Sequence, residues 1–327
     1  MALFEIKVKG KSGFINKHGD LVIQPQFEKA LKFSDGLAFA SVKVDNKELA
    51  GFINESGEWV IEPVYSGLPL YNMFPSVYFS QGYAPVKLPD NKKKFFIDKN
   101  GDPITDPIYE NAFPFSESRA LVKRNGLYGY IDLLGKEITP CQFGEPPLDP
   151  MDCRFSEGLA LARFGNEDEG NLHYIDSQGK AVIEGPFIKA NPFSEGFAMV
   201  TGEGDFGEYY FINKEGEIPF EQVSLQSTSF SEGLAGVYDP EMECIGFISS
   251  SGDWVIKPQF EYALWFSEGL SLVQHFGSKK KGFINPQGEL IIKHIDIALP
   301  FCNGLAYVHK NKQKGYINTK GEFVWTE

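Results

Sequence analysis

The histidines are the side chains best suited to acid–base or metal chemistry near neutral pH, and five of them are scattered along the chain. No His-Glu-x-x-His pattern or other helical zinc spacing is present. Two of them occupy positions of a sequence repeat that is described below: His18 lies in a predicted hairpin turn, and His173 replaces a repeated glycine. We therefore predict no catalytic or metal-binding role for His18, His173, His275, His294 or His309.

A carboxylate recurs in a short phrase, Phe-Ser-Glu-Gly, along most of the chain. Aligned copies could form a ladder of negative charge for a cationic partner. The same position also suits a turn residue that accepts backbone N–H bonds, and we favour this structural role. The carboxylates are Asp35, Glu117, Glu157, Glu195, Glu232 and Glu268.

Other signatures of catalysis are missing from the sequence. It has no Gly-x-Ser-x-Gly elbow, phosphate loop or dinucleotide fingerprint. The recurring Asn/Asp-x-x-Gly turns lack the dense alternating oxygen ligands of a calcium loop. A carboxylate pair for glycoside hydrolysis cannot be located from sequence, because the separation that matters is spatial. We expect no catalytic residue, no cofactor and no metal.

Two phrases repeat along the whole chain, at intervals of roughly 33 to 46 residues, a period typical of solenoids, propellers and arrays. The first, Gly-Phe-Ile-Asn-x-x-Gly, occurs in nine copies with some substitutions. The second, Phe-Ser-Glu-Gly-Leu-Ala-x-Val, is clear in six copies and altered near Phe79 and Phe115. The nine closing glycines of the first phrase are Gly19, Gly57, Gly101, Gly135, Gly179, Gly216, Gly252, Gly288 and Gly321.

The first phrase predicts a β-hairpin in every copy. Its Asn, Asp or Ser side chain can bond the backbone two residues on, and its closing glycine can take positive φ without steric conflict. Apolar and β-branched residues flank the turn, as in Phe14-Ile15 before it and Leu21-Val22-Ile23 after it. A proline such as Pro25 then ends the second strand, and a connector leads to the second phrase, which begins a third strand.

The repeats predict an all-β fold, a tandem array of nine short three-stranded antiparallel meander units in a single domain over residues 1–327. Whole units at both ends favour an open, solenoid-like superhelix. A β-propeller is the alternative, because the aromatic-x-x-Ala stretch of each connector could supply a short fourth strand.

Charge and cysteine content restrict the partners and the compartment. The net charge of −13 disfavours nucleic acid and anionic membrane surfaces. The four cysteines follow neither a CxxC pattern nor the repeat period, which favours free thiols, although Cys141 and Cys153 could pair. No signal peptide and no apolar run long enough to span a membrane are present, so we expect a cytoplasmic protein.

The chain resembles the WG-repeat (KWG) family of bacterial β-repeat proteins. The resemblance rests on the two repeated phrases and on the Val-Ile-x-Pro stretch between them, and it covers nearly the whole chain. The tryptophan that gives the family its name is absent from its slot before the glycine, where Ser12, Ala50, Tyr128 and Lys281 stand. The resemblance implies a bacterial origin and a binding module without shared catalytic residues.

Local function should lie where the copies differ, because folding explains the repeated positions but not the insertions. The largest departures are Gly67–Gln81, Phe143–Arg154, Gly165–Asn171, Gly202–Glu208 and Asp239–Cys244. The first is apolar for a loop. It would be a contact patch if exposed, and only a misaligned connector if folded inward. As candidate partner contacts we select Tyr71, Phe74, Tyr78 and Phe206.

These observations predict a non-catalytic binding scaffold rather than an enzyme. A protein–protein interaction module, such as an immunity or accessory protein, is the leading hypothesis. A carbohydrate-binding module that uses exposed Tyr and Trp between repeats is the first alternative. An enzyme built on a closed β-propeller is the second.

Overall fold

The computed structural model describes residues 2–67, 77–146, 149–165, 171–202, 209–220 and 228–327. Strands dominate, and the one helix among the described residues is the short 3-10 helix η1 (Pro150–Cys153). No helix in these residues is long and apolar enough to cross a membrane. The chain divides into two compact units, Met1–Gly170 with Ile175–Lys180 and Asn171–Tyr174 with Ala181–Glu327, and each is described by itself.

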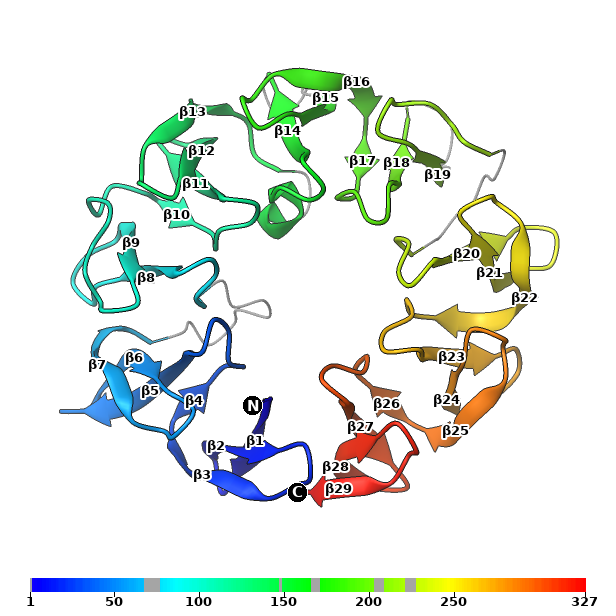
Figure 1. Cartoon of the computed structure of the whole chain (residues 1–327), viewed down its shortest axis with the longest axis horizontal. Coiled ribbons are helices and arrows are strands. Elements are labelled where there is room, and N and C mark those ends of the chain that lie inside the picture. The colour runs from blue at the N-terminus through cyan, green and yellow to red at the C-terminus, as the bar shows by residue number, and fades with distance from the viewer. Residues whose placement is uncertain (1, 68–76, 147–148, 166–170, 203–208, 221–227) are drawn as a thin grey trace. The chain divides into compact units, whose positions relative to one another are not determined.

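Unit 1 consists of small antiparallel sheets that follow one another in chain order (Figure 1). Their orders are β1-β2-β3, β4-β5-β6-β7, β8-β9 and β10-β11-β12-β13. The strands are β1 (Leu3–Val8), β2 (Lys11–Asn16), β3 (Leu21–Phe27), β4 (Lys29–Ala30), β5 (Ala38–Val44), β6 (Lys47–Ile53), β7 (Trp59–Ser66), β8 (Tyr83–Lys87), β9 (Lys94–Asp98), β10 (Asn111–Ala112), β11 (Arg119–Arg124), β12 (Leu127–Asp132) and β13 (Glu137–Phe143). Around the boundary between the units follow β14 (Ala160–Phe164), β15 (Asn171–Ile175) and β16 (Ala181–Phe187).

Unit 2 repeats the same architecture. Its sheets have the orders β17-β18-β19, β20-β21-β22-β23-β24-β25 and β26-β27-β28-β29. The strands are β17 (Lys189–Ala190), β18 (Ala198–Thr201), β19 (Tyr209–Ile212), β20 (Leu234–Asp239), β21 (Cys244–Ser249), β22 (Trp254–Ala263), β23 (Ser271–His275), β24 (Lys281–Ile284), β25 (Leu290–Ile295), β26 (Ile297–Ala298), β27 (Leu305–Lys310), β28 (Gln313–Asn318) and β29 (Phe323–Thr326).

The hairpin turn of the first phrase has the same hydrogen bonds in copy after copy. In the first, the Asn16 side-chain oxygen accepts bonds from the backbone N–H groups of His18 and Asp20 at 2.8 and 3.0 Å. The N–H of Gly19 donates to the carbonyl of Asn16 at 3.0 Å. The nine closing glycines have φ between +76° and +90°. This is a type I turn closed by a residue in the left-handed region, which Asx and Gly favour.

The core of each unit is built by aromatic pairs that join successive repeats. The aromatic residue of one hairpin phrase packs on the Phe that opens the following Phe-Ser-Glu-Gly phrase, as in Phe14 with Phe33 at 4.9 Å between ring centroids. Edge-on contacts of this kind are favourable beyond the area they bury. The same pairing recurs in Phe52–Phe79, Phe96–Phe115, Tyr130–Phe155, Tyr174–Phe193, Phe211–Phe230, Phe247–Phe266 and Phe283–Phe301.

The connectors supply a fourth strand, and this corrects one prediction. The two-residue strands β4, β10, β17 and β26 pair with β5, β11, β18 and β27, and the end of β22 pairs with β23 in the same way. The alanine of each pair is buried, as in Ala30 and Ala112. The repeats are therefore not three-stranded meanders stacked in an open, solenoid-like superhelix. The prediction of an open array of nine such meanders was wrong. Within each unit the small antiparallel sheets are arranged as β-propeller blades, which was the alternative.

Candidate functional site

The Ser-Glu-Gly stretch of the second phrase forms a tight two-residue hairpin turn. In its first copy, Ser34 and Leu37 exchange backbone hydrogen bonds of 2.9 and 3.1 Å. Asp35 and Gly36 between them have φ of +53° and +85°, as in a type I′ turn. An acidic residue in this left-handed conformation costs about 1–2 kcal/mol, so its recurrence in the other copies requires a reason.

The reason is a link from each turn to the next. The carboxylate of Glu117 accepts bonds from the backbone N–H groups of Glu157 and Gly158 at 2.6 and 2.7 Å. Glu195 binds the next turn in the same way, and further links run from Asp35 to Gly82, Glu232 to Gly269 and Glu268 to Gly304. The favoured structural role is confirmed for five of the six carboxylates, which accept backbone N–H bonds from the turn of a neighbouring repeat: Asp35, Glu117, Glu195, Glu232 and Glu268.

The serine of the same turn forms a second link. Its hydroxyl donates to the carbonyl of the phenylalanine that opens the next copy of the phrase, at 2.6 to 2.7 Å. The pairs are Ser80–Phe115, Ser116–Phe155, Ser194–Phe230, Ser231–Phe266 and Ser267–Phe301. Both repeated polar groups of the turn thus serve the scaffold, and sites for a partner have to be sought among residues that do not repeat.

A polar pocket in unit 2 combines such residues with the turn serines Ser194 and Ser231, and we call it the Trp265 pocket. Its volume is ≈ 490 Å³. Trp265 stands directly before the repeated phenylalanine and is 45% exposed. The lining consists of Asn191, Ser194, Thr228, Ser229, Phe230, Ser231 and Trp265.

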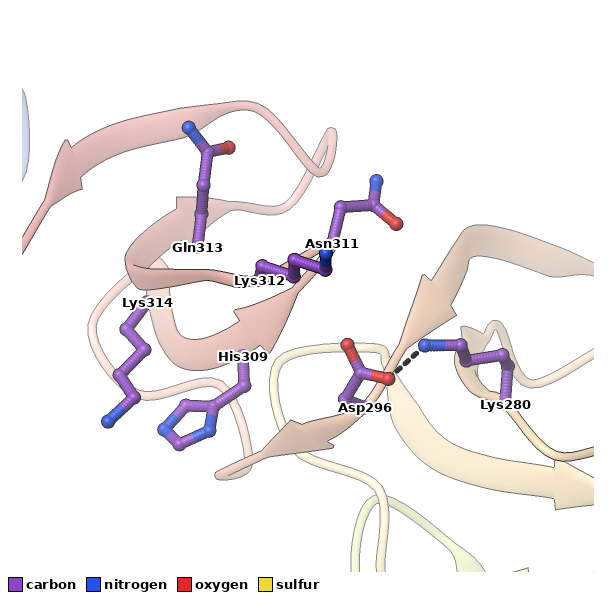
Figure 2. A pocket seen from close by; sticks show the side chains of 7 residues that line it. All are labelled: Lys280, Asp296, His309, Asn311, Lys312, Gln313 and Lys314. Atoms are coloured by element: carbon purple, nitrogen blue, oxygen red, sulfur yellow. Dashed lines mark hydrogen bonds and ion pairs between the residues drawn. The ribbon is translucent and has the colours of Figure 1, made fainter.

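A basic pocket in unit 2 lies at the tip of the β27–β28 hairpin (Figure 2). Its volume is ≈ 580 Å³. Three lysines and one histidine face it against one aspartate, on a chain whose net charge is −13. Figure 2 shows His309 and Lys314, a cross-strand pair, on one side and the Lys280–Asp296 ion pair on the other. The lining is Lys280, Asp296, His309, Asn311, Lys312, Gln313 and Lys314.

Part of the basic pocket is a structural clasp that also occurs in unit 1. There, Glu110 pairs with Lys93 at 3.2 Å and accepts the N–H of Gly126 in the β11–β12 hairpin turn at 3.0 Å. In unit 2, Asp296 pairs with Lys280 and accepts the N–H of Asn311 in the β27–β28 turn.

The bond from Lys280, and next its positive charge and the N–H of Asn311, lower the pKa of Asp296. The clasp therefore accounts for Lys280 and Asp296. It does not explain Lys312 and Lys314, because the matching hairpin positions of unit 1 hold Gly126 and Tyr128. The position of His309 holds Lys123 in unit 1.

The four partner contacts predicted from sequence are only partly placed. Tyr71, Phe74 and Phe206 lie outside the described residues. Tyr78 is half-buried, and its hydroxyl accepts a hydrogen bond from the guanidinium of Arg154 at 3.0 Å. Sequence reasoning missed Trp265. Its signal was the slot before the repeated phenylalanine, where other copies have Lys32, Tyr78, Pro114, Arg154, Pro192, Ser229 and Pro300.

Several titratable groups lie in the cores of the two units. Within them, no group of three or more His, Cys, Asp or Glu side chains could hold a metal ion. All four cysteines, Cys141 and Cys153 included, are free thiols. Burial raises the pKa of the Cys153 thiol and of the Tyr130 hydroxyl. Burial, followed by the charge of Lys87, lowers the pKa of Lys94 to about 8. Its ammonium donates to the Asn111 side chain at 2.6 Å.

Comparison with known proteins identifies a repeat and a fold. A family model described as WG containing repeat matches residues 13–47, 51–92, 95–128, 128–167, 174–201, 245–279 and 282–313, more than half of the chain. No curated protein matches the sequence. The crystal structure of a eukaryotic initiation factor is similar over 100% of this chain and 95% of that chain, with 12% identity and a TM-score of 0.64.

Two enzymes are more distant in structure. Dihydro-heme d1 dehydrogenase NirN matches 88% of this chain and 69% of its own, with 14% identity and a TM-score of 0.42. Puromycin hydrolase matches 88% of this chain and 50% of its own, with 10% identity and a TM-score of 0.39. The similarity to the initiation factor, at 12% identity, concerns the fold and not the activity.

Proposed function

Because this chain belongs to the WG-repeat family and its repeated polar side chains hold neighbouring repeats together, we propose that it is a non-catalytic scaffold that binds a protein partner. The contact surface includes the basic pocket at the β27–β28 hairpin, and the partner offers acidic side chains there. The observation that carries the proposal is the pair Lys312 and Lys314, two positive charges that the repeated clasp does not require, since unit 1 has Gly126 and Tyr128 at the matching positions.

Electrostatics supports this choice of surface. A local excess of positive charge attracts an acidic segment of a partner. The negative charges elsewhere on the chain repel that segment only weakly, because salt screens charges that are far apart. Lys312 and Lys314 are exposed, so their ammonium groups can reach a partner without a change in the fold. Glu327 follows strand β29 and lies beside Lys314, to whose carbonyl its N–H donates. The Glu327 carboxylate accepts a hydrogen bond from the Tyr307 hydroxyl at 2.6 Å.

The test compares two charge-reversed variants in affinity capture from lysate of the source cells. Lys312→Glu with Lys314→Glu alters the basic pocket. Lys43→Glu with Lys47→Glu changes the net charge equally on the β5–β6 hairpin of unit 1. A protein captured by the unaltered chain should be lost with the first variant, retained with the second and weakened by salt. Capture of the same protein by both variants would refute the assignment of the surface.

A further inference from the structure

The Trp265 pocket has a lining without any charged side chain. All seven residues that line it are neutral: Asn191, Ser194, Thr228, Ser229, Phe230, Ser231 and Trp265. A pocket that recognises phosphate, carboxylate or an amine normally places an opposite charge or several oriented donors against it. The lining therefore selects a polar ligand that carries no net charge.

The hydroxyl and amide groups of the pocket retain hydrogen-bonding capacity of both kinds. Ser194 and Ser231 use their O–H groups on the carbonyls of Phe230 and Phe266 at 2.7 Å, so their oxygens can still accept. The Thr228 oxygen accepts the N–H of Gly236 at 2.8 Å, so its own O–H can donate.

Asn191 adds an amide with donors and an acceptor, and its contact with the Ser229 hydroxyl is long, at 3.5 Å. Mixed donors and acceptors on one surface suit a ligand whose own groups are hydroxyls, each of which donates and accepts.

The indole of Trp265 supplies the apolar surface of the site. The side chain is 45% exposed, and the scaffold does not require it, since proline, lysine or arginine stands in the same slot of other repeats. A flat aromatic face beside hydroxyl and amide groups can pack against the C–H face of a sugar ring while the ring hydroxyls bond to the pocket. The volume of ≈ 490 Å³ is in the range of small-molecule sites.

We propose that the Trp265 pocket binds a neutral carbohydrate, with one sugar ring stacked on Trp265 and its hydroxyls bonded to Asn191, Thr228 and Ser229. This site is separate from the basic pocket, and the inference is independent of the proposed protein partner. The probes are oligosaccharides of glucose, mannose and N-acetylglucosamine, with a uronic acid oligosaccharide as the charged counterpart. Binding is measured by calorimetry and by the tryptophan emission of the full chain.

At least one neutral oligosaccharide should bind the unaltered chain, and Trp265→Ala should weaken that binding about tenfold or more. Phe276→Ala, which removes another exposed aromatic residue of unit 2 outside the pocket, should bind as the unaltered chain does. Ser229→Ala, a smaller change, should weaken binding severalfold and serves if Trp265→Ala does not fold.

Absence of binding by every neutral probe at millimolar concentration, or equal binding by Trp265→Ala, would overturn the proposal. Binding of the uronic acid probe alone, lost in Lys312→Glu with Lys314→Glu, would also overturn it, because the site would then be the basic pocket. If the capture experiment contradicts the basic pocket as the partner surface while the sugar still binds at Trp265, only the proposed function is refuted.

Discussion

The contact between one hairpin glycine and the preceding repeat gives a quantitative test of how the repeats are held together. Gly179 has φ of +80°, and a Cβ placed on it would overlap the Cγ2 methyl of Thr139 in the third strand of the repeat before. The next nearest atom is the Thr139 Cβ at 3.2 Å. Gly36 is a matched control, because its φ is +85° and a Cβ there would meet no atom within 4 Å.

The two alanine variants separate backbone strain from packing. Gly36→Ala should destabilise by about 1–2 kcal/mol, the cost of a side chain at positive φ. Gly179→Ala should lose the same amount and about 1–3 kcal/mol more, because overpacking displaces buried Thr139. Thr139→Ser removes the overlapping methyl but keeps the hydroxyl oxygen that accepts the N–H of Tyr130 at 3.0 Å.

The double variant Gly179→Ala with Thr139→Ser should therefore be more stable than the sum of the single changes predicts, by about 1–3 kcal/mol. Urea denaturation of the four chains gives this coupling energy, provided that the slope of the transition stays constant. Equal losses for Gly36→Ala and Gly179→Ala, or strict additivity in the double variant, would refute the inter-repeat contact as a source of stability.

Three further predictions concern groups with defined partners. In urea denaturation, Glu117→Gln should lower the free energy of unfolding by about 1–3 kcal/mol, since it weakens the link to the next turn. Glu215→Gln, in an exposed hairpin turn, should change it by less than about 0.5 kcal/mol. Bonds from the Gly126 N–H and from Lys93 lower the pKa of Glu110, so its stabilisation is present above its ordinary pKa and is lost as the pH falls through the folded value. Glu110→Gln should then flatten the acid side of the pH–stability curve, and an unchanged acid side would contradict this. The folded pKa of Lys94 is lowered to about 8, so the unfolded chain binds more protons above that pH and stability should rise with pH there; Lys94→Met should abolish the rise between about pH 7 and 9.5 in urea titrations.

The local parts of the fold were predictable because their causes are local. The hairpin of the first phrase depends on an Asx side chain and a glycine three residues later, so nine copies in the sequence indicate nine turns. The acidic residue of the second phrase was assigned to a turn for the same kind of reason. The hydrogen bond from this carboxylate to the following repeat could not be predicted from one copy. The acceptor and the donor are about 40 residues apart, as in Glu117 and Glu157.

The arrangement of the sheets was predicted less well because it depends on very short, non-local pairings. A strand of two residues, such as Lys29–Ala30, has no periodicity of its own. Its pairing with Ser41 and Ala40 turns a three-stranded meander into a four-stranded blade. The repeated aromatic-x-x-Ala stretch was the available signal, and it supported the propeller alternative.

One repeat reaches the common geometry by a different route, which a search for identical phrases conceals. Most copies have a glycine in the middle of the strand before the hairpin turn, because a Cβ there would meet the backbone of the strand after the turn. At Gly13 the atoms would be Ile23 O at 2.5 Å and Pro25 N at 2.6 Å. In the fifth copy His173 fills that slot and Gly185 stands where other copies have proline. In this repeat the glycine is on the facing strand, where it leaves room for the His173 side chain. His173 Nδ1 accepts the Gly185 N–H at 3.4 Å. The histidine therefore has a structural explanation in its packing and in this hydrogen bond.

At the position of Trp265, the contribution of a side chain to folding can be separated from its contribution to ligand binding. Repeats that fold alike carry proline, lysine, arginine, serine or tyrosine there, so the blade does not depend on the side chain. The turn two residues later is held by Ser267 and Glu268, whose bonds to Phe301 and Gly304 do not involve the indole. Removal of the Trp265 side chain should consequently leave the urea midpoint nearly unchanged while it weakens sugar binding about tenfold or more. Stability and binding would fall together only if the exposed indole were part of the core, which its 45% exposure contradicts.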